Sequence, residues 1–87
     1  QEKLSIAEKI MQKRLVKKFM SNGVTFINPD SVYLSYDTEI GNGTLISPNV
    51  FFDLNVKVGN YVKIDPFVYL KNCNIEDNTY IESFKKI

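Results

Sequence analysis

A hydrophobic residue recurs every six positions through most of this 87-residue chain, and this period restricts the fold more than any other feature. Two positions before each of these residues except the last, Ile87, stands a smaller one, most often valine or threonine. Six residues are too few for a helix but suit one short strand and a turn. With one residue missing after Leu70, the main positions are Leu34, Ile40, Ile46, Phe52, Val58, Ile64, Leu70, Ile75, Ile81 and Ile87.

A longer period of eighteen residues is nested in these hexads. Gly41-Asn42 aligns with Gly59-Asn60 at this spacing, and Pro48 aligns with Pro66. Three hexads that close on themselves make a triangular coil, and such coils stack as parallel sheets. We therefore predict a parallel β-helix over residues 34–87, with the main hydrophobic residues inside and with glycines that give the turns freedom in φ.

The first part of the chain has a helical period instead. Ser5 and Glu8 have the spacing of a capping box, and Asn22-Gly23 suits a helix C-terminus. We predict a helical arm over residues 1–22, a connecting segment over 23–33 and β-helix coils over 34–87. Further apolar residues flank the expected buried stripe, so contact on more than one side of the helix is predicted. The stripe itself contains Leu4, Ala7, Met11, Leu15 and Phe19.

Composition restricts the kinds of site that the chain can form. It contains no histidine and a single cysteine, Cys73, so neither an internal disulfide nor a histidine-ligated zinc site is available. Cys73 occupies one of the smaller inward positions, where we expect a buried packing role and not a reactive thiol. No apolar run approaches the roughly 18 residues that span a bilayer, so we expect a soluble, cytoplasmic chain without a membrane partner.

Charge is unevenly distributed along the chain. Residues 1–20 hold six basic and two acidic residues, whereas residues 21–87 hold five basic and eight acidic residues. No aromatic residues interleave with the basic ones, so we expect a solvated helix face and no nucleic-acid partner. A small binding module that uses this helix on an acidic partner is the alternative function. The basic face consists of Lys9, Lys13, Arg14 and Lys17.

The eighteen-residue period also predicts two columns of side chains on adjacent coils. One column contains Ser47, Asp65 and Glu82. We favour solvated turn residues over a metal site there, so no metal ligand is predicted. The other column points outward and contains Tyr33, Phe51 and Tyr69. A free surface rarely leaves three stacked aromatic side chains exposed, so we predict that this column contacts the helical arm or a neighbouring subunit.

The order of these segments resembles that of a known enzyme family. The resemblance rests on three segments: the helical stretch 7–14, the segment Gly23-Val24-Thr25-Phe26-Ile27-Asn28-Pro29 and the first hexads at 31–34. They are similar to bacterial bifunctional N-acetylglucosamine-1-phosphate uridyltransferase/glucosamine-1-phosphate N-acetyltransferases. In that family a helical arm leads from a nucleotidyltransferase domain into a left-handed β-helix of hexapeptide repeats. The resemblance covers essentially the whole chain and implies a mainly β fold, a left-handed parallel β-helix preceded by one α-helix.

The resemblance also implies a parent enzyme with two activities. Such a parent would make UDP-N-acetylglucosamine for the peptidoglycan cell wall from glucosamine-1-phosphate, acetyl-CoA and UTP, with magnesium as cofactor. The glycine-rich loop and the catalytic histidine of the family match no position here, so no catalytic, cofactor-binding or metal residue is assigned. We expect a fragment that is inactive alone, binds no cofactor and serves as a scaffold, forming a homotrimer through its β-helix. An acyl-CoA site shared between subunits is the less favoured alternative.

Overall fold

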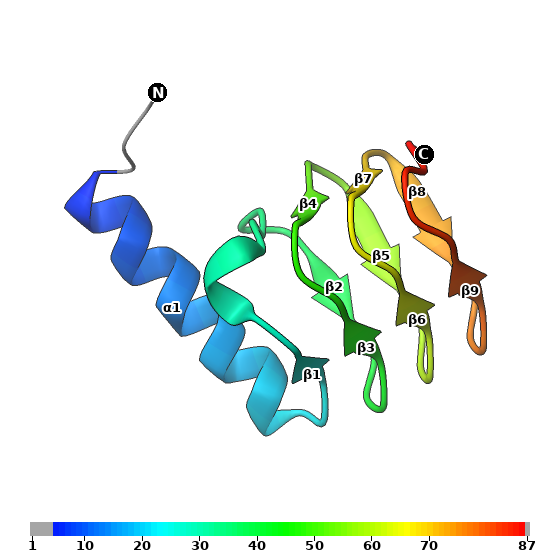
Figure 1. Cartoon of the computed structure of the whole chain (residues 1–87). Helices are drawn as coiled ribbons and strands as arrows, with labels where there is room; N and C mark the ends of the chain where they lie inside the picture. The colour runs from blue at the N-terminus through cyan, green and yellow to red at the C-terminus, as the bar shows by residue number, and fades with distance from the viewer. Residues whose placement is uncertain (1–4, 87) are drawn as a thin grey trace.

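Within residues 5–86, which the computed structural model describes, one helix and one 3-10 turn accompany nine short strands (Figure 1). The helix is α1 (Ile6–Ser21) and the 3-10 turn is η1 (Pro29–Ser31). The strands are β1 (Thr25–Phe26), β2 (Glu39–Ile40), β3 (Leu45–Ile46), β4 (Val50–Phe52), β5 (Val56–Val58), β6 (Lys63–Ile64), β7 (Val68–Leu70), β8 (Cys73–Ile75) and β9 (Tyr80–Ile81). The predicted positions Leu4 and Ile87 lie outside the described residues.

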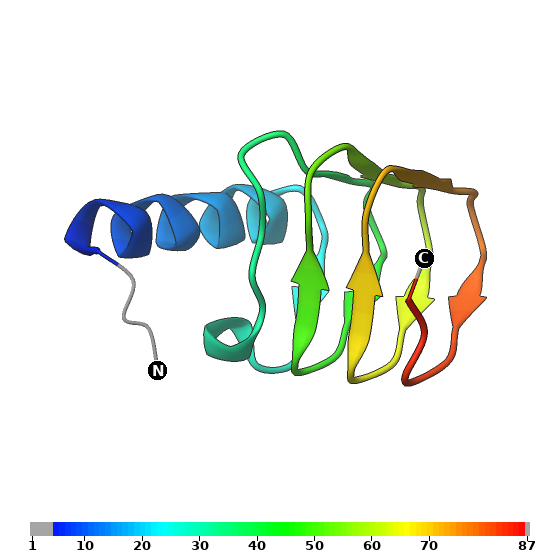
Figure 2. The same cartoon turned by 90° about the horizontal axis from the view of Figure 1, so that it is seen from above.

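Three parallel sheets form the walls of a β-helix, in the strand orders β1-β3-β6-β9, β2-β5-β8 and β4-β7. Leu45 pairs with Lys63, which confirms the eighteen-residue period. Lys57 pairs with Asn74, one residue closer, because one residue is missing between β7 and β8. In Figures 1 and 2 the chain climbs the near side at β3 and β6 and descends the far side at β2 and β5 as it leaves α1. This path is left-handed, so the predicted fold class is confirmed.

The core is a column of side chains enclosed by the three sheets. The inward residue of each coil wall is fully buried at Ile46, Phe52 and Ile64, and each such side chain contributes about 1.5–3 kcal/mol. Ile75 and Ile81 remain buried after the missing residue, so the shortened hexad leaves the inward pattern intact. The main hydrophobic residues of the hexads therefore hold the coils together, as the sequence predicts.

The turns of the coils place a residue at positive φ near each corner. Glycine and asparagine tolerate this left-handed region, but three corner residues are aromatic. The corner residues with positive φ are Gly43, Asn49, Asn55, Tyr61, Phe67, Asn72, Asn78 and Phe84. Gly41 is different, because its φ is not positive and a Cβ there would lie 2.7 Å from the backbone carbonyl carbon and oxygen of Gly59 on the next coil. The predicted reason for Gly41 and Gly59 was therefore wrong: close approach of the next coil requires these glycines.

Helix α1 lies across the end of the stack beside the first coil (Figure 1). The Glu8 N–H donates to the Ser5 hydroxyl oxygen over 3.1 Å, so the predicted N-terminal cap is present, and Asn22 caps the other end. Phe19 is buried in the core, with Leu15 and Val16 packed against it. Ala7 is exposed, contrary to the predicted stripe, because the helix turns Glu8 and Gln12 toward the coils instead.

Candidate association surface

A stacked column of three aromatic side chains covers the outside of β4 and β7. The rings of Tyr33 and Phe51 lie 4.7 Å apart between centroids, at an interplanar angle of 15°. The rings of Phe51 and Tyr69 lie 5.3 Å apart, at 9°. Backbone pairing of Tyr33 with Phe51 and of Phe51 with Tyr69 aligns the rings, so the predicted column is confirmed. Phe51 stays 40% exposed at its centre.

A second aromatic stack lies at the corner that leads into β7. The rings of Phe67 and Phe84 are parallel within 1°, with centroids 5.3 Å apart. Phe67 is 53% exposed and Phe84 is 81% exposed, and both have positive φ. Phe67 stands two residues before Tyr69, so the two stacks occupy one side of the β-helix. The sequence analysis did not predict this pair. The two phenylalanines are seventeen residues apart, because the residue missing after Leu70 shortens the eighteen-residue period by one.

Hydrogen bonds between coils hold the hydroxyls of two tyrosines, Tyr69 on β7 and Tyr80 on the separate wall that contains β9. The Tyr69 hydroxyl donates to the Asp53 carboxylate, and this bond lowers the pKa of Asp53 and raises the pKa of Tyr69. The Tyr80 hydroxyl donates to Asp65 in the same way, which raises the pKa of Tyr80. Burial is the main cause of the raised pKa of Tyr33, followed by the charge of Glu8 on α1. The hydroxyls of Tyr69 and Tyr80 thus each connect one coil to the next through a carboxylate.

One polar side chain of α1 closes the open backbone edge of the first coil. The Gln12 amide donates to the Leu34 carbonyl oxygen over 2.6 Å, and its oxygen accepts from the Leu34 N–H over 2.9 Å. This two-way pairing imitates the hydrogen bonds of a neighbouring strand. Edge strands with free N–H and C=O groups tend to pair with other chains, so Gln12 protects this edge. Sequence reasoning did not single out Gln12.

The structure also places the turn residues that the sequence aligned in a second column. Ser47, Asp65 and Glu82 lie on adjacent coils as predicted, since the Ser47 and Asp65 N–H groups donate to carbonyls of β6 and β9. Ser47 is buried, and the Asp65 carboxylate accepts from Tyr80. Within residues 5–86, no group of three or more histidine, cysteine, aspartate or glutamate residues is arranged to hold a metal ion. No catalytic group is therefore assigned to this column.

Cys73 is only half-buried, although the sequence predicts a buried packing position. It packs against the core, but β8 is the last strand of its sheet, so no further described strand covers it. Burial raises the pKa of the thiol, which keeps it in its less reactive protonated form. A packing role accounts for its position.

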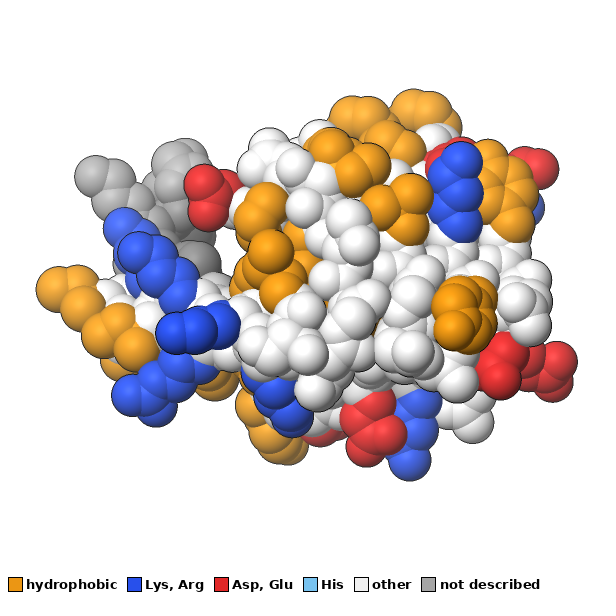
Figure 3. All heavy atoms as spheres, turned by 90° about the horizontal axis from the view of Figure 1, so that it is seen from below, with side chains coloured by type: hydrophobic (Ala, Val, Ile, Leu, Met, Phe, Trp, Pro, Cys, Tyr) orange, Lys and Arg blue, Asp and Glu red, His pale blue; other side chains and the backbone are white. Residues whose placement is uncertain are grey.

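The predicted basic residues lie on the exposed side of α1. Lys9, Lys13, Arg14 and Lys17 are all exposed. Basic side chains gather over the α1 end of the molecule when it is seen from below, next to exposed hydrophobic ones (Figure 3). Ile6 and Ile10 are exposed apolar residues of this helix. Among the described residues, no helix is long and apolar enough to cross a membrane.

Fold and surface together define a class of protein. The chain is a hexapeptide-repeat β-helix protein with a helix against the first coil and an outward aromatic column. No protein-family model matches it. Its sequence nevertheless aligns with curated proteins over most of its length, and these proteins are its homologues over the segment that it covers.

The relatives all carry the name bifunctional protein GlmU. The protein of Zymomonas mobilis is 38% identical over 84 residues, which are 97% of this chain and 19% of the relative. The protein of Bartonella quintana is 48% identical over 67 residues, which are 77% of this chain and 15% of the relative. The protein of Wolbachia pipientis is 40% identical over 81 residues, which are 93% of this chain and 19% of the relative. The chain thus spans less than a fifth of the length of these relatives.

Proposed function

We propose that this chain is the arm and first coils of a GlmU-type bifunctional enzyme, where it serves as scaffold and association surface. Three copies associate side by side through the outer face of β4 and β7. The observation that carries the proposal is the aromatic column of Tyr33, Phe51 and Tyr69, whose middle ring is 40% exposed. Exposed, stacked aromatic side chains of this kind are typical of interfaces between proteins.

The side of the β-helix that carries this column favours a neighbouring subunit over the helical arm as its partner. Helix α1 lies at the end of the stack, where the charge of Glu8 acts on Tyr33. Phe51 and Tyr69 lie one and two coils farther from that end. The second stack extends the apolar surface away from α1 to Phe84. A surface that continues past the reach of α1 needs a second chain to cover it.

The parent activity follows from the family resemblance. The whole enzyme would acetylate glucosamine-1-phosphate with acetyl-CoA and then transfer a uridylyl group from UTP, in a magnesium-dependent step, to give UDP-N-acetylglucosamine in the cytoplasm. The chain contributes no catalytic residue to either step. Its polar groups instead connect neighbouring coils, as in the bonds from Tyr69 to Asp53 and from Ser35 to the Phe52 carbonyl oxygen. The role proposed for these residues is therefore structural.

A matched pair of variants tests the association surface. Phe51→Ser removes the central ring of the column, whereas Tyr36→Ser removes an aromatic side chain that is 74% exposed elsewhere. Sedimentation velocity at equal protein concentration should show a smaller species for the Phe51 variant and an unchanged one for the Tyr36 variant. Far-UV circular dichroism establishes that both variants fold. Unchanged association of the folded Phe51 variant contradicts the proposed surface.

A further inference from the structure

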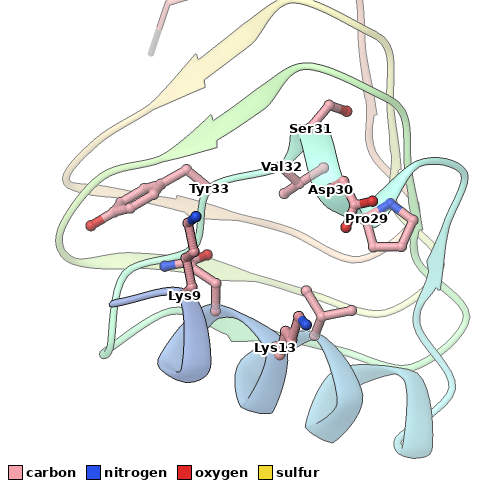
Figure 4. Close-up of a pocket in the computed structure, with 9 residues that line it drawn as sticks. Lys9, Lys13, Pro29, Asp30, Ser31, Val32 and Tyr33 are labelled. Carbon is pink, nitrogen blue, oxygen red and sulfur yellow. The ribbon is translucent and has the colours of Figure 1, made fainter. Parts of the chain in front are cut away.

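A cleft separates α1 from η1 and the residues that follow it (Figure 4). Its volume is about 580 Å³, which falls within the range of about 300–1,000 Å³ that is usual for small-molecule sites. Val16 of α1 and Val32 and Pro29 of the facing segment give it an apolar lining. Lys9 and Lys13 rise from α1 at the same cleft, and the Tyr33 ring closes one side.

We propose that this cleft binds a small organic anion with an apolar body, of the class of aromatic or short-chain carboxylates. The apolar body would lie against Val16, Val32 and Pro29, where it removes apolar surface from water. The carboxylate would lie between the ammonium groups of Lys9 and Lys13. Hydrogen bonds to charged groups are stronger than neutral ones, so the two lysines supply the selectivity for an anion. The proposal goes beyond the scaffold role and does not depend on it.

The polar groups around the cleft restrict which ligand fits. Gln12 also lines the cleft, but its amide already pairs with both backbone groups of Leu34. The lysines are therefore the donors left for a ligand on the α1 side. Asp30 stands on the opposite wall, and its negative charge directs a carboxylate away from itself and toward Lys9 and Lys13.

The charge of the whole helix favours the same ligand class. Helix α1 carries five basic residues and one acidic residue, Glu8. A cationic ligand would be repelled by this field, and a neutral apolar ligand would leave the ammonium groups of Lys9 and Lys13 without an anionic partner. Inorganic phosphate supplies charge but no apolar body, so it would use only half of the cleft. An amphipathic anion uses both halves.

Benzoate tests this site, with benzyl alcohol and inorganic phosphate as the two comparison probes. Each is titrated into the ¹⁵N-labelled chain, and amide shifts are followed by NMR. Benzoate should give saturable shifts at the amides of residues 9–16 and 30–33. Benzyl alcohol has the same ring without the charge, and inorganic phosphate has charge without a ring. Both should bind at least roughly tenfold more weakly, since each lacks one of two contributions of about 1.4 kcal/mol or more.

A matched pair of double variants separates the site from general attraction to a basic helix. Lys9→Met with Lys13→Met removes both ammonium groups at the cleft but keeps their aliphatic length. Lys17→Met with Lys18→Met removes the same charge at exposed positions outside the cleft lining. Benzoate affinity should fall about tenfold in the first variant and less than twofold in the second. The NMR spectrum of each free variant establishes that it is folded.

Three results would overturn the proposal: non-saturable benzoate shifts, equal binding of benzoate and phosphate, or equal losses in the two double variants. Each of them is read at the cleft amides, whatever the mass of the species in solution. Failure of the proposed association surface would instead show as unchanged sedimentation of the Phe51 variant, so the two failures are distinguishable.

Discussion

The Gln12 amide pairs with both backbone groups of Leu34, and replacing it by leucine removes both hydrogen bonds at once. Each bond contributes about 0.5–1.5 kcal/mol net, and a polar group left unpaired away from water costs about 1–3 kcal/mol. Leucine and glutamine have similar helix propensities, so α1 itself is little affected. Leu34 is fully buried, so both of its backbone groups would be left unpaired away from water, and we expect a loss of about 2–6 kcal/mol in the free energy of unfolding.

Urea denaturation followed by far-UV circular dichroism measures this loss. Lys17→Gln is the matched control, because Lys17 is exposed on the same helix and its replacement should change stability by less than about 0.5 kcal/mol. A Gln12→Leu variant as stable as this control would refute the strand-like role of Gln12. Concentration-dependent association of the variant through the freed edge is the accompanying expectation.

A Gln12→Glu variant adds a pH test of the same contact. At neutral pH a carboxylate there would accept from the Leu34 N–H but face the Leu34 carbonyl oxygen, and it would lie near Glu8, whose carboxylate accepts from Gln12 over 3.1 Å. These neighbours raise the pKa of the new carboxyl in the folded chain. The variant should therefore be more stable below its unfolded pKa and lose that stability as the pH rises through the folded pKa.

Three further predictions concern the coils and the chemistry of the chain. Gly41→Ala should cost about 1–3 kcal/mol in urea denaturation, because the added Cβ would lie 2.7 Å from the backbone carbonyl carbon and oxygen of Gly59; an unchanged midpoint contradicts the close approach. The Tyr69–Asp53 bond should stabilise the fold between pH 3.8 and pH 10.0, the ordinary pKa values of the two groups. This contribution should be lost as the pH falls through the lowered pKa of Asp53, and also as the pH rises through the raised pKa of Tyr69. Tyr69→Phe should reduce the acid loss, because the Leu54 N–H and Lys71 still lower the pKa of Asp53. It should remove part of the alkaline loss, since the pKa values of Tyr33 and Tyr80 are also raised; a pH profile identical to that of the unchanged chain contradicts the bond. The purified chain should transfer neither acetyl nor uridylyl groups in coupled assays, and detection of either reaction would overturn the scaffold role.

The coils are the part of the structure that the sequence predicts best. Side chains on each strand point alternately into and out of the β-helix, so a hydrophobic residue at the six-residue period, such as Phe52 or Ile64, is recognisable from the sequence as an inward residue. The aromatic column follows from the same period, because one coil spans eighteen residues and places Phe51 under Tyr33.

Other features depend on contacts that a periodic pattern does not contain. The role of Gln12 depends on how α1 is rotated against the first coil, and a polar residue beside the apolar stripe gives no sign of it. Phe84 sits at positive φ, where local preference favours asparagine or glycine, so its place beside Phe67 is set by the stacking of whole coils. The cleft between α1 and η1 is lined by two separate segments of the chain, and the spacing of residues in the sequence does not predict how far apart these segments lie.

The mass of the chain in solution shows whether copies associate through the aromatic face of β4 and β7. Static light scattering over a dilution series measures it, and the chain itself has a mass of 10.0 kDa. We predict a species near three times that mass, which dissociates only on dilution, because the aromatic face of β4 and β7 is covered by neighbouring copies. A mass of 10.0 kDa at every concentration would contradict association through this face.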